Sequence, residues 1–195
     1  TEAKSAIATA QAAGITVRMI TGDHFETAYH IGKELGLVRH RSEVFDSRQM
    51  SMMSDDDLAE RLKTIRVCAR VLPEYKHRIL EILKQHDITA MTGDGVNDIP
   101  ALTNAHVGVA MGSGAQIAKD AGDIILLDNN FQSIVSAIHE GRTVYANIKR
   151  MVTYLLSTNL GEVLVSLGSL IVGLPLPLTP VQILWINLVT DSAMV

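Results

Sequence analysis

Three short stretches of the sequence hold side chains that suit phosphate and magnesium chemistry. The first supplies the Thr21 hydroxyl and the Gly22 amide, the second Lys76, and the third, a glycine-rich loop, Asp94 and Asp98. Carboxylate oxygens are ligands that Mg²⁺ takes, and hydroxyl, amide and ammonium groups bind phosphoryl oxygens. The two carboxylates stand four residues apart and would repel each other unless a cation joined them. We therefore expect a phosphate and magnesium site.

Each stretch also has a purely structural interpretation. The Thr-Gly-Asp run at residues 21–23 is a common strand-to-helix turn in which Asp23 caps the helix, and Lys76 alone would be a solvated surface lysine. The order of a threonine loop, a lysine and an acidic loop is more specific than any one of them. That order favours the functional interpretation.

A second set of polar side chains lies in an apolar region near the C-terminus. Residues 151–195 contain no Lys, Arg or His, and their only acidic residues are Glu162 and Asp191. A carboxylate at the centre of a membrane helix costs about 3 kcal/mol, whereas each Leu returns only about 0.5 kcal/mol. With no basic side chain to neutralise them, the two acids predict a bound hard cation.

Neighbouring oxygen-bearing side chains extend this predicted cation site. Asn159 lies three residues before Glu162 on one helical face, while Asn187, Thr190 and Asp191 share a face of the next segment. For Asn159 or Thr190 alone, hydrogen bonding between helices is an equally good interpretation. Calcium takes six to eight oxygens, so we expect further ligands from outside these two segments.

The elements that position the first site form an α/β pattern. Over residues 1–130, short apolar runs alternate with amphipathic helical patterns, which predicts a parallel sheet flanked by helices. Ligands bind at the carboxyl ends of such strands, where the three stretches fall. Strands are expected at 15–20, 67–71, 88–91, 107–110 and 124–127, and helices at 2–13, 24–35, 55–64, 73–85 and 115–121. Residues 39–54 are expected to be irregular, and we assign them no role.

The C-terminal third of the sequence predicts a stalk and a membrane hairpin. A helical pattern begins near Phe131 and continues through a stalk at 131–150 into a first span at 151–172, about 33 Å long at the α-helical rise. A Gly- and Pro-containing turn separates it from a second span at 178–195. Basic residues just before the first span and none in the far turn predict an integral membrane protein with its soluble domain in the cytoplasm.

Composition excludes some classes of function. The net charge of -4 with scattered basic residues gives no footprint for nucleic acid. The single cysteine, Cys68, excludes an internal disulfide and a thiolate-based zinc cluster. The sequence starts without a signal peptide and stops inside an apolar helical pattern, so we interpret it as a fragment.

Residues 91–102 (MTGDGVNDIPAL) resemble the hinge motif of P-type cation-transporting ATPases, members of the haloacid dehalogenase superfamily. Residues 20–27 (ITGDHFET) and 69–76 (ARVLPEYK) resemble two further motifs in their usual order. The resemblance implies that 1–130 is the C-terminal part of a Rossmann-like phosphorylation domain that uses ATP and Mg²⁺. By this resemblance Asp94 would bind Mg²⁺, Asp98 would hold the acidic loop, Thr21, Gly22 and Lys76 would contact the phosphoryl group, and Asp23, Arg70 and Asn97 would lie near the nucleotide.

The membrane segments resemble the fifth and sixth transmembrane helices of sarcoplasmic-reticulum type calcium ATPases, through residues 157–162 (STNLGE) and 185–191 (WINLVTD). In that group the residues matching Asn159, Glu162, Asn187, Thr190 and Asp191 coordinate calcium. Sodium/potassium pumps typically have Pro and Asp where this sequence has Gly161 and Asn187, and heavy-metal pumps use a Cys-containing motif that is missing here. The resemblance favours Ca²⁺ as the transported ion, with manganese, sodium, potassium or protons as alternatives.

One departure from the family bears on activity. The family's nucleophile is the Asp of an Asp-Lys-Thr-Gly motif, which the sequence lacks, so we expect the chain alone to be inactive. The resemblance implies, as partners, the actuator and nucleotide-binding domains and the other transmembrane helices of the intact pump. A soluble haloacid dehalogenase-type phosphatase and a non-catalytic membrane-anchored protein are the rival interpretations.

Overall fold

The computed structural model describes residues 2–194, with the side chains of residues 191–194 left undescribed. The chain forms two compact units, Thr1–Ala137 and Ile138–Val195. The first unit contains all the strands of the described chain, and the second is helical.

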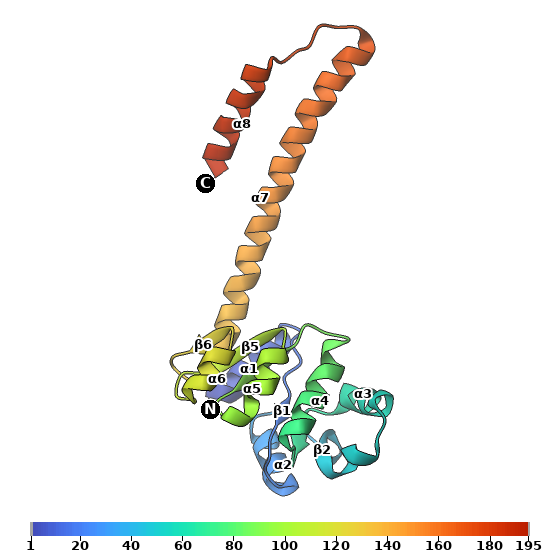
Figure 1. Ribbon diagram of the computed structural model, residues 1–195, viewed down its shortest axis with the longest axis vertical. Helices are drawn as coiled ribbons and strands as arrows, with labels where there is room; N and C mark the ends of the chain where they lie inside the picture. The colour runs from blue at the N-terminus through green and yellow to red at the C-terminus, as the bar shows by residue number, and fades with distance from the viewer. Residues whose placement is uncertain (1, 195) are drawn as a thin grey trace. The chain divides into compact units, whose positions relative to one another are not determined.

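The first unit contains two three-stranded parallel sheets (Figure 1). One has the order β1 (Met19–Ile20), β3 (Val67–Ala69), β2 (Val44–Asp46), and the other β4 (Ala90–Gly93), β5 (Val107–Met111), β6 (Ile124–Leu126). Every strand pairing is parallel. The predicted α/β class is thereby confirmed, although the strands divide between two sheets, with β1 and β4 each at an edge.

Helices of the first unit begin and end at residues that act locally. They are α1 (Glu2–Ala12), α2 (Phe25–Glu34), α3 (Asp55–Thr64), α4 (Pro73–Lys84), α5 (Ile99–Asn104) and α6 (Gln116–Ala121), with 3₁₀ turns η1 (Arg41–Glu43), η2 (Ser47–Met52) and η3 (Val96–Asp98). Gly14 and Gly36 adopt positive φ angles of 80° and 77° just after α1 and α2, as helix-ending glycines do. The Ser54 hydroxyl accepts a hydrogen bond from the Asp57 amide at 3.2 Å and caps α3.

Strand β3 is at the centre of the core. Cys68 packs in one apolar cluster with Leu58 of α3 and Ile79 of α4, while Val67 and Ala69 pack in another cluster with Ala28 of α2. Successive residues of a strand face opposite sides of its sheet, so these two clusters lie on the two faces. Helices therefore cover both faces of the β1-β3-β2 sheet, as a buried parallel sheet requires.

The prediction for residues 39–54 was wrong. This segment contains strand β2, in which Val44 and Phe45 are 5% and 2% exposed, followed by η2. Three residues are too few to show a strand period in the sequence, and the strand forms because β3 offers parallel hydrogen bonds. Strand β1 is also shorter than predicted, with Met19–Ile20 in place of residues 15–20.

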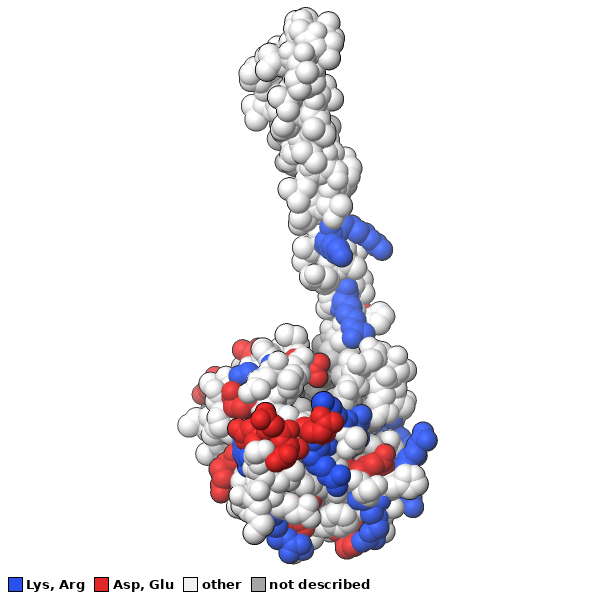
Figure 2. Space-filling model, turned by 90° about the vertical axis from the view of Figure 1, so that its right-hand side faces the viewer, with Lys and Arg blue, Asp and Glu red and all other residues white. Residues whose placement is uncertain are grey.

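The second unit contains most of α7 (Phe131–Val172) and the whole of α8 (Pro180–Met194). Gly173 follows α7 directly and has a positive φ of 76°. Among the described residues, α7 is the one helix long and apolar enough to cross a membrane, with a mean hydropathy of 1.6 over its most apolar window. Residues Pro180–Thr190 of α8 form a shorter apolar helix. Figure 2 shows basic side chains near one end of this unit. The rest of its visible face shows no charged side chains.

Candidate functional site

The acidic loop is closed by an ion pair. Lys76, in the first turns of α4, donates a 2.7 Å hydrogen bond to Asp98 Oδ1, and the Gly95 amide donates to Asp98 Oδ2 at 3.4 Å. Asp98 is only 8% exposed. The cation that the two acids were predicted to need is thus a lysine in the case of Asp98. The pair brings together two residues that the sequence placed 22 positions apart.

Glycine is required at only one of the two positions that flank Asp94. A Cβ on Gly93 would lie 2.5 Å from Asp98 Cβ, so any side chain there displaces the paired acid. At Gly95 the nearest atom to a Cβ would be Asp98 Oδ2 at 3.6 Å, an ordinary contact. Close approach of the backbone is therefore needed at Gly93 and not at Gly95.

Asp94 is held by its backbone and leaves its side chain exposed. Its carbonyl accepts a 3.0 Å hydrogen bond from the Ala115 amide, and a Cβ on Gly114 would lie 2.7 Å from the same oxygen. Its carboxylate makes no hydrogen bond or ion pair with the residues that the structure describes. Mg²⁺ is held by one or two carboxylates, with water and phosphate oxygens completing the shell. A single exposed carboxylate on a fixed loop fits that requirement.

The threonine loop follows β1. The Thr21 hydroxyl donates to Asp23 Oδ2 at 2.8 Å and accepts from the Asp23 amide at 3.1 Å. Residue His24, not Asp23, is the N-cap of α2, so the proposed helix-capping role of Asp23 is not seen. These bonds form a turn that places the Gly22 amide and the Thr21 hydroxyl at the carboxyl end of β1.

Arg70 lies just beyond the carboxyl end of β3 and links to both neighbouring strands. Its amide donates to the Asp23 carbonyl at 2.8 Å, and its carbonyl accepts from the Ser47 hydroxyl. Its Nε is 3.8 Å from Oδ2 of Asp46, the last residue of β2. Sequence reasoning missed Asp46 and Ser47 because they stand in the segment predicted to be irregular.

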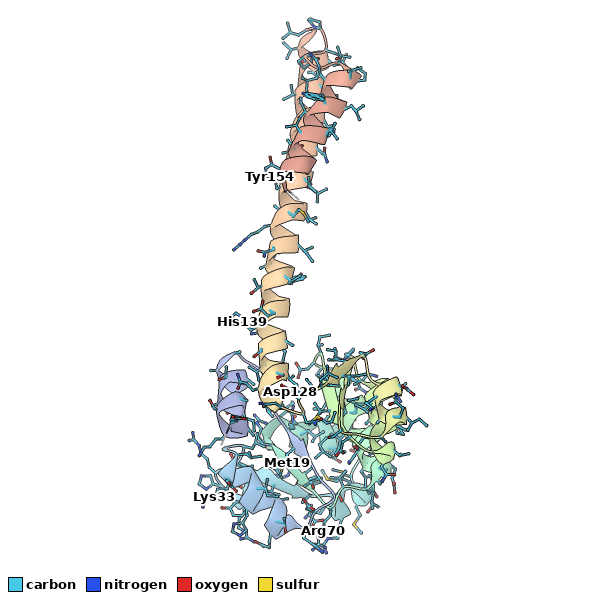
Figure 3. The ribbon with its side chains drawn as sticks, turned by 90° about the vertical axis from the view of Figure 1, so that its left-hand side faces the viewer. Met19, Lys33, Arg70, Asp128, His139 and Tyr154 are labelled. Atoms are coloured by element: carbon cyan, nitrogen blue, oxygen red, sulfur yellow. The ribbon has the colours of Figure 1, made fainter. Side chains whose placement is uncertain are left out.

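The predicted residues of the first unit thus form two groups among the described contacts. One group contains Thr21, Asp23 and Arg70, and the other contains Lys76, Gly95 and Asp98. Only a short connection separates Arg70 from Pro73, the first residue of α4, and α4 carries Lys76. Both groups follow carboxyl ends of parallel strands, and Figure 3 shows Arg70 at the opposite end of the unit from Asp128. Asn97, in η3, is exposed.

Electrostatics at this edge centre on Asp46. The Arg48 side chain donates to both carboxylate oxygens, with a closest distance of 2.7 Å. These hydrogen bonds lower the pKa of Asp46, burial opposes them, and the Arg70 charge adds the smallest contribution. Asp46 therefore stays ionised at neutral pH. One buried carboxylate at the end of β2 faces two guanidinium groups.

The predicted cation ligands of the second unit are partly described. Glu162 on α7 is half-buried, and its Oε1 is shielded from solvent without a hydrogen-bond partner among the described residues. Thr190 turns its hydroxyl to the Ile186 and Asn187 carbonyls of its own helix. Asn159 is exposed and Asn187 half-buried. The side chain of Asp191 lies outside the described residues.

Comparison with known proteins identifies the family. A model of haloacid dehalogenase-like hydrolases matches residues 1–106, more than half of the chain, and a second model with the same description matches 77–138. The chain belongs to the haloacid dehalogenase-like hydrolases. The Thr21, Lys76 and Asp98 region lies wholly within the first match.

The chain is similar to calcium-transporting ATPases of two bacteria. It is 46% identical over 193 residues to a calcium-transporting ATPase of Bacillus subtilis (strain 168), an alignment that covers 98% of the chain and 22% of the relative. It is 50% identical over 187 residues to calcium-transporting ATPase 1 of Lactococcus lactis subsp. lactis (strain IL1403), covering 95% of the chain and 21% of the relative. The chain spans about a fifth of the length of these relatives.

Solved structures of P-type ATPases also superpose on the chain. A zinc-transporting PIB-type ATPase in an E2.Pi state superposes with a TM-score of 0.67 at 28% identity, over 98% of the chain and 25% of that structure. The catalytic domain of a CPx-ATPase superposes with a TM-score of 0.51 at 28% identity, over 71% of the chain and 44% of that structure. The first alignment extends beyond the α/β unit, so the similarity to P-type ATPases includes α7.

Proposed function

We propose that this chain is a segment of an ATP-driven P-type pump that forms an aspartyl-phosphate and moves Ca²⁺ across a membrane. The observation that carries the proposal is Glu162, whose Oε1 is shielded from solvent and has no hydrogen-bond partner among the described residues, on an apolar helix that begins in the α/β unit. A buried carboxylate oxygen without a donor is stabilised by a cation. The hydrolase unit would supply the energy for moving that cation.

The hydrolase residues have distinct roles in this proposal. Lys76 would place its charge beside a phosphoryl oxygen while Asp98 fixes the position of its amine, and Thr21 with the Gly22 amide would donate to another oxygen. Asp94 would hold Mg²⁺, which supplies positive charge that stabilises the phosphoryl oxygens when it is bound. Arg70, Asp23 and Asn97 would lie toward the nucleotide.

The nucleophile would come from another part of the intact pump. No Asp-Lys-Thr-Gly run occurs in the sequence, so we infer that the chain alone forms no aspartyl-phosphate. Strands β1 and β4 carry the threonine and acidic loops, and each is an edge strand with unpaired backbone groups on one side. The segment that supplies the nucleophile would lie beside these edge strands.

The choice of Ca²⁺ rests on the polar set of the second unit and on the relatives. Oxygen ligands suit a hard cation, and five side chains on α7 and α8 offer oxygens: Asn159, Glu162, Asn187, Thr190 and Asp191. Neither helix contains a cysteine, the soft ligand expected for zinc or copper. The calcium-transporting relatives are 46% and 50% identical, against 28% for the zinc-transporting one.

The membrane arrangement is part of the proposal. Residues 151–172 and 178–195 would span a bilayer as a hairpin, with 131–150 as a stalk and the α/β unit in the cytoplasm. Arg142, Lys149 and Arg150 precede the first span, which agrees with the excess of basic residues on cytoplasmic sides.

Replacement of Glu162 in the full-length pump tests the proposal. We expect Glu162→Gln to raise the calcium concentration for half-maximal ATP hydrolysis about tenfold or more, since Gln keeps an oxygen ligand but loses the charge, and a contact to a charged group contributes about 1.5 to 3 kcal/mol. Glu140→Gln is the matched control, because Glu140 lies on the same helix with a side chain 77% exposed. An unchanged calcium dependence in Glu162→Gln would refute the assignment of Glu162 as a ligand. Activation of the wild-type pump by manganese and not by calcium would make manganese the transported ion.

A further inference from the structure

Arg70 adopts a backbone conformation that its residue type disfavours. Its φ is 56°, and among the described non-glycine residues only Asn129 shares a positive φ. Asn tolerates this region because its short side chain bonds locally, whereas for a long side chain the strain is of order 1 kcal/mol or more. Such strain persists only where surrounding contacts hold the residue, and it concentrates at functional sites.

Two hydrogen bonds hold the backbone of Arg70 in this conformation. On one side its amide donates to the Asp23 carbonyl at 2.8 Å, and on the other its carbonyl accepts from the Ser47 hydroxyl. Ser47 is 2% exposed, so its hydroxyl has no water to compete for it. The backbone of Arg70 is therefore clamped between the loops that follow β1 and β2.

The side chain of Arg70 is directed by Asp46. Its Nε is buried without a hydrogen-bond partner among the described residues, and Asp46 Oδ2 lies 3.8 Å away. Parallel pairing of β2 with β3 places Asp46 opposite Ala69, the residue before Arg70. The carboxylate attracts the Nε side of the guanidinium, and the terminal nitrogens make no hydrogen bond to the residues that the structure describes.

A second guanidinium competes for the same carboxylate but is placed differently. The Arg48 side chain is 68% exposed, whereas that of Arg70 is 33% exposed. The Arg48 side chain forms hydrogen bonds with Asp46, whereas the Arg70 side chain interacts with it only through charge, at 3.8 Å. Asp46 thus has enough partners to stay ionised without consuming the donors of Arg70.

We propose that Asp46 and Ser47 are positioning residues that hold the Arg70 guanidinium at the carboxyl edge of the sheet to bind a phosphate of the nucleotide. This inference rests on the proposed function, and it gives a role to the segment that follows β2. An arginine held from its Nε side presents two parallel N–H groups, the geometry that phosphate accepts.

Asp46→Asn in the full-length pump is the main test, since it removes the charge with little change of shape. We expect the KM for ATP to rise about three- to tenfold, with kcat within about twofold of the wild type. Arg48→Ala is the matched control and should leave the KM within about twofold, because it removes the hydrogen bonds from Arg48 but keeps the Asp46 carboxylate beside Arg70 Nε. In an Arg70→Ala background, Asp46→Asn should add no further rise.

Other outcomes would overturn the inference. Asp46 also caps η2, because its Oδ1 accepts a hydrogen bond from the Arg48 amide at 3.1 Å. If Arg48→Ala raises the KM as much as Asp46→Asn does, or if Asp46→Asn acts equally without Arg70, then Asp46 only stabilises this turn. Should Asp46→Asn fail to fold, Ser47→Ala takes its place, with a rise in KM expected and an unchanged KM counting against the inference. ATP hydrolysis by the wild type without any cation dependence would refute the pump assignment, yet the comparison of KM values would still decide the role of Asp46.

Discussion

The ion pair between Lys76 and Asp98 has consequences for the glycine beside it. Because a Cβ on Gly93 would lie 2.5 Å from Asp98 Cβ, Gly93→Ala must displace the acid and break its 2.7 Å contact with Lys76. We expect a loss of stability of about 1 to 3 kcal/mol, as for other overpacked sites. Gly95→Ala is the control in the same loop, and its effect should stay within about 0.5 kcal/mol.

Thermal unfolding of the detergent-solubilised chain, followed by circular dichroism, measures both glycine variants. Equal effects at the two positions would contradict the geometry of the acidic loop. In the full-length pump, Gly93→Ala should also abolish phosphoenzyme formation, since the Lys76 amine then loses the carboxylate that positions it.

Cys68 provides a second residue-scale prediction. Burial raises the pKa of its thiol to about 12, with the nearby Arg18 charge opposing weakly. The thiolate is the reactive form, so iodoacetamide at about pH 9 should leave Cys68 unmodified in the folded chain and alkylate it after unfolding in urea. Glu34→Cys, at an exposed position of α2, is the reactive control. Alkylation of folded Cys68 at the control rate would contradict its burial.

Linkage gives the sign of the pH effect at Cys68. Its folded pKa is above the ordinary value, so the unfolded chain loses the thiol proton first as the pH rises. The contribution to stability is therefore present below about pH 9 and is lost between about pH 9 and pH 12. Cys68→Ala should reduce the dependence of melting temperature on pH within that window.

At the scale of elements, local signals were predictable and tertiary ones were not. Gly14, Gly36, Ser54 and Pro73 fix the ends of helices through their own backbone chemistry, so the predicted helices were placed within a few residues, whereas the short helix α5 was not predicted. Strand β2 depends on β3 for its hydrogen bonds and offers only three residues of pattern, so it was missed. Because β2 was not predicted, Asp46 at its carboxyl end was not recognised as a candidate site residue.

The candidate site shows the same division. Residue types and strand-end positions predicted Thr21, Lys76 and Asp98, because parallel strands bring their carboxyl ends to one edge. The contact between Lys76 and Asp98 joins two elements 22 residues apart and follows from how α4 and η3 pack, which no local pattern encodes. The sequence therefore supplied candidate residues for the site but not the contacts between them.

Helix α7 begins in the α/β unit and continues through the apolar segment as one element of 42 residues. If it carries the coupling between ATP hydrolysis and the ion, a break in its exposed middle should uncouple them. Tyr145 is 68% exposed, so Tyr145→Pro removes a backbone hydrogen bond, at about 3 kcal/mol, with little loss of packing. In the full-length pump we expect ATP binding to persist and calcium-activated hydrolysis to be lost. Tyr145→Ala should retain both, and retained calcium activation in the proline variant would exclude α7 as the coupling element.

At the scale of the whole molecule, the surface of the first unit suits water, whereas that of the second suits lipid. The first buries its apolar side chains between sheets and helices, whereas α7 and α8 expose many large ones, among them Leu164, Leu170 and Leu184. Exposed apolar helices of this length are stable in lipid, where backbone groups are already paired within the helix. This contrast is the physical basis for proposing a cytoplasmic domain joined to a membrane hairpin.

The proposed orientation can be tested with single cysteines, because Cys68 is buried and should not react. Leu174→Cys, 60% exposed in the turn between α7 and α8, should be labelled by a membrane-impermeant maleimide added to intact cells. Glu34→Cys, in the α/β unit, should be labelled only after the cells are made permeable. If both positions are labelled under the same condition, residues 151–172 do not separate them by a bilayer. Glu162 would then face water, which satisfies a carboxylate oxygen without any transported cation.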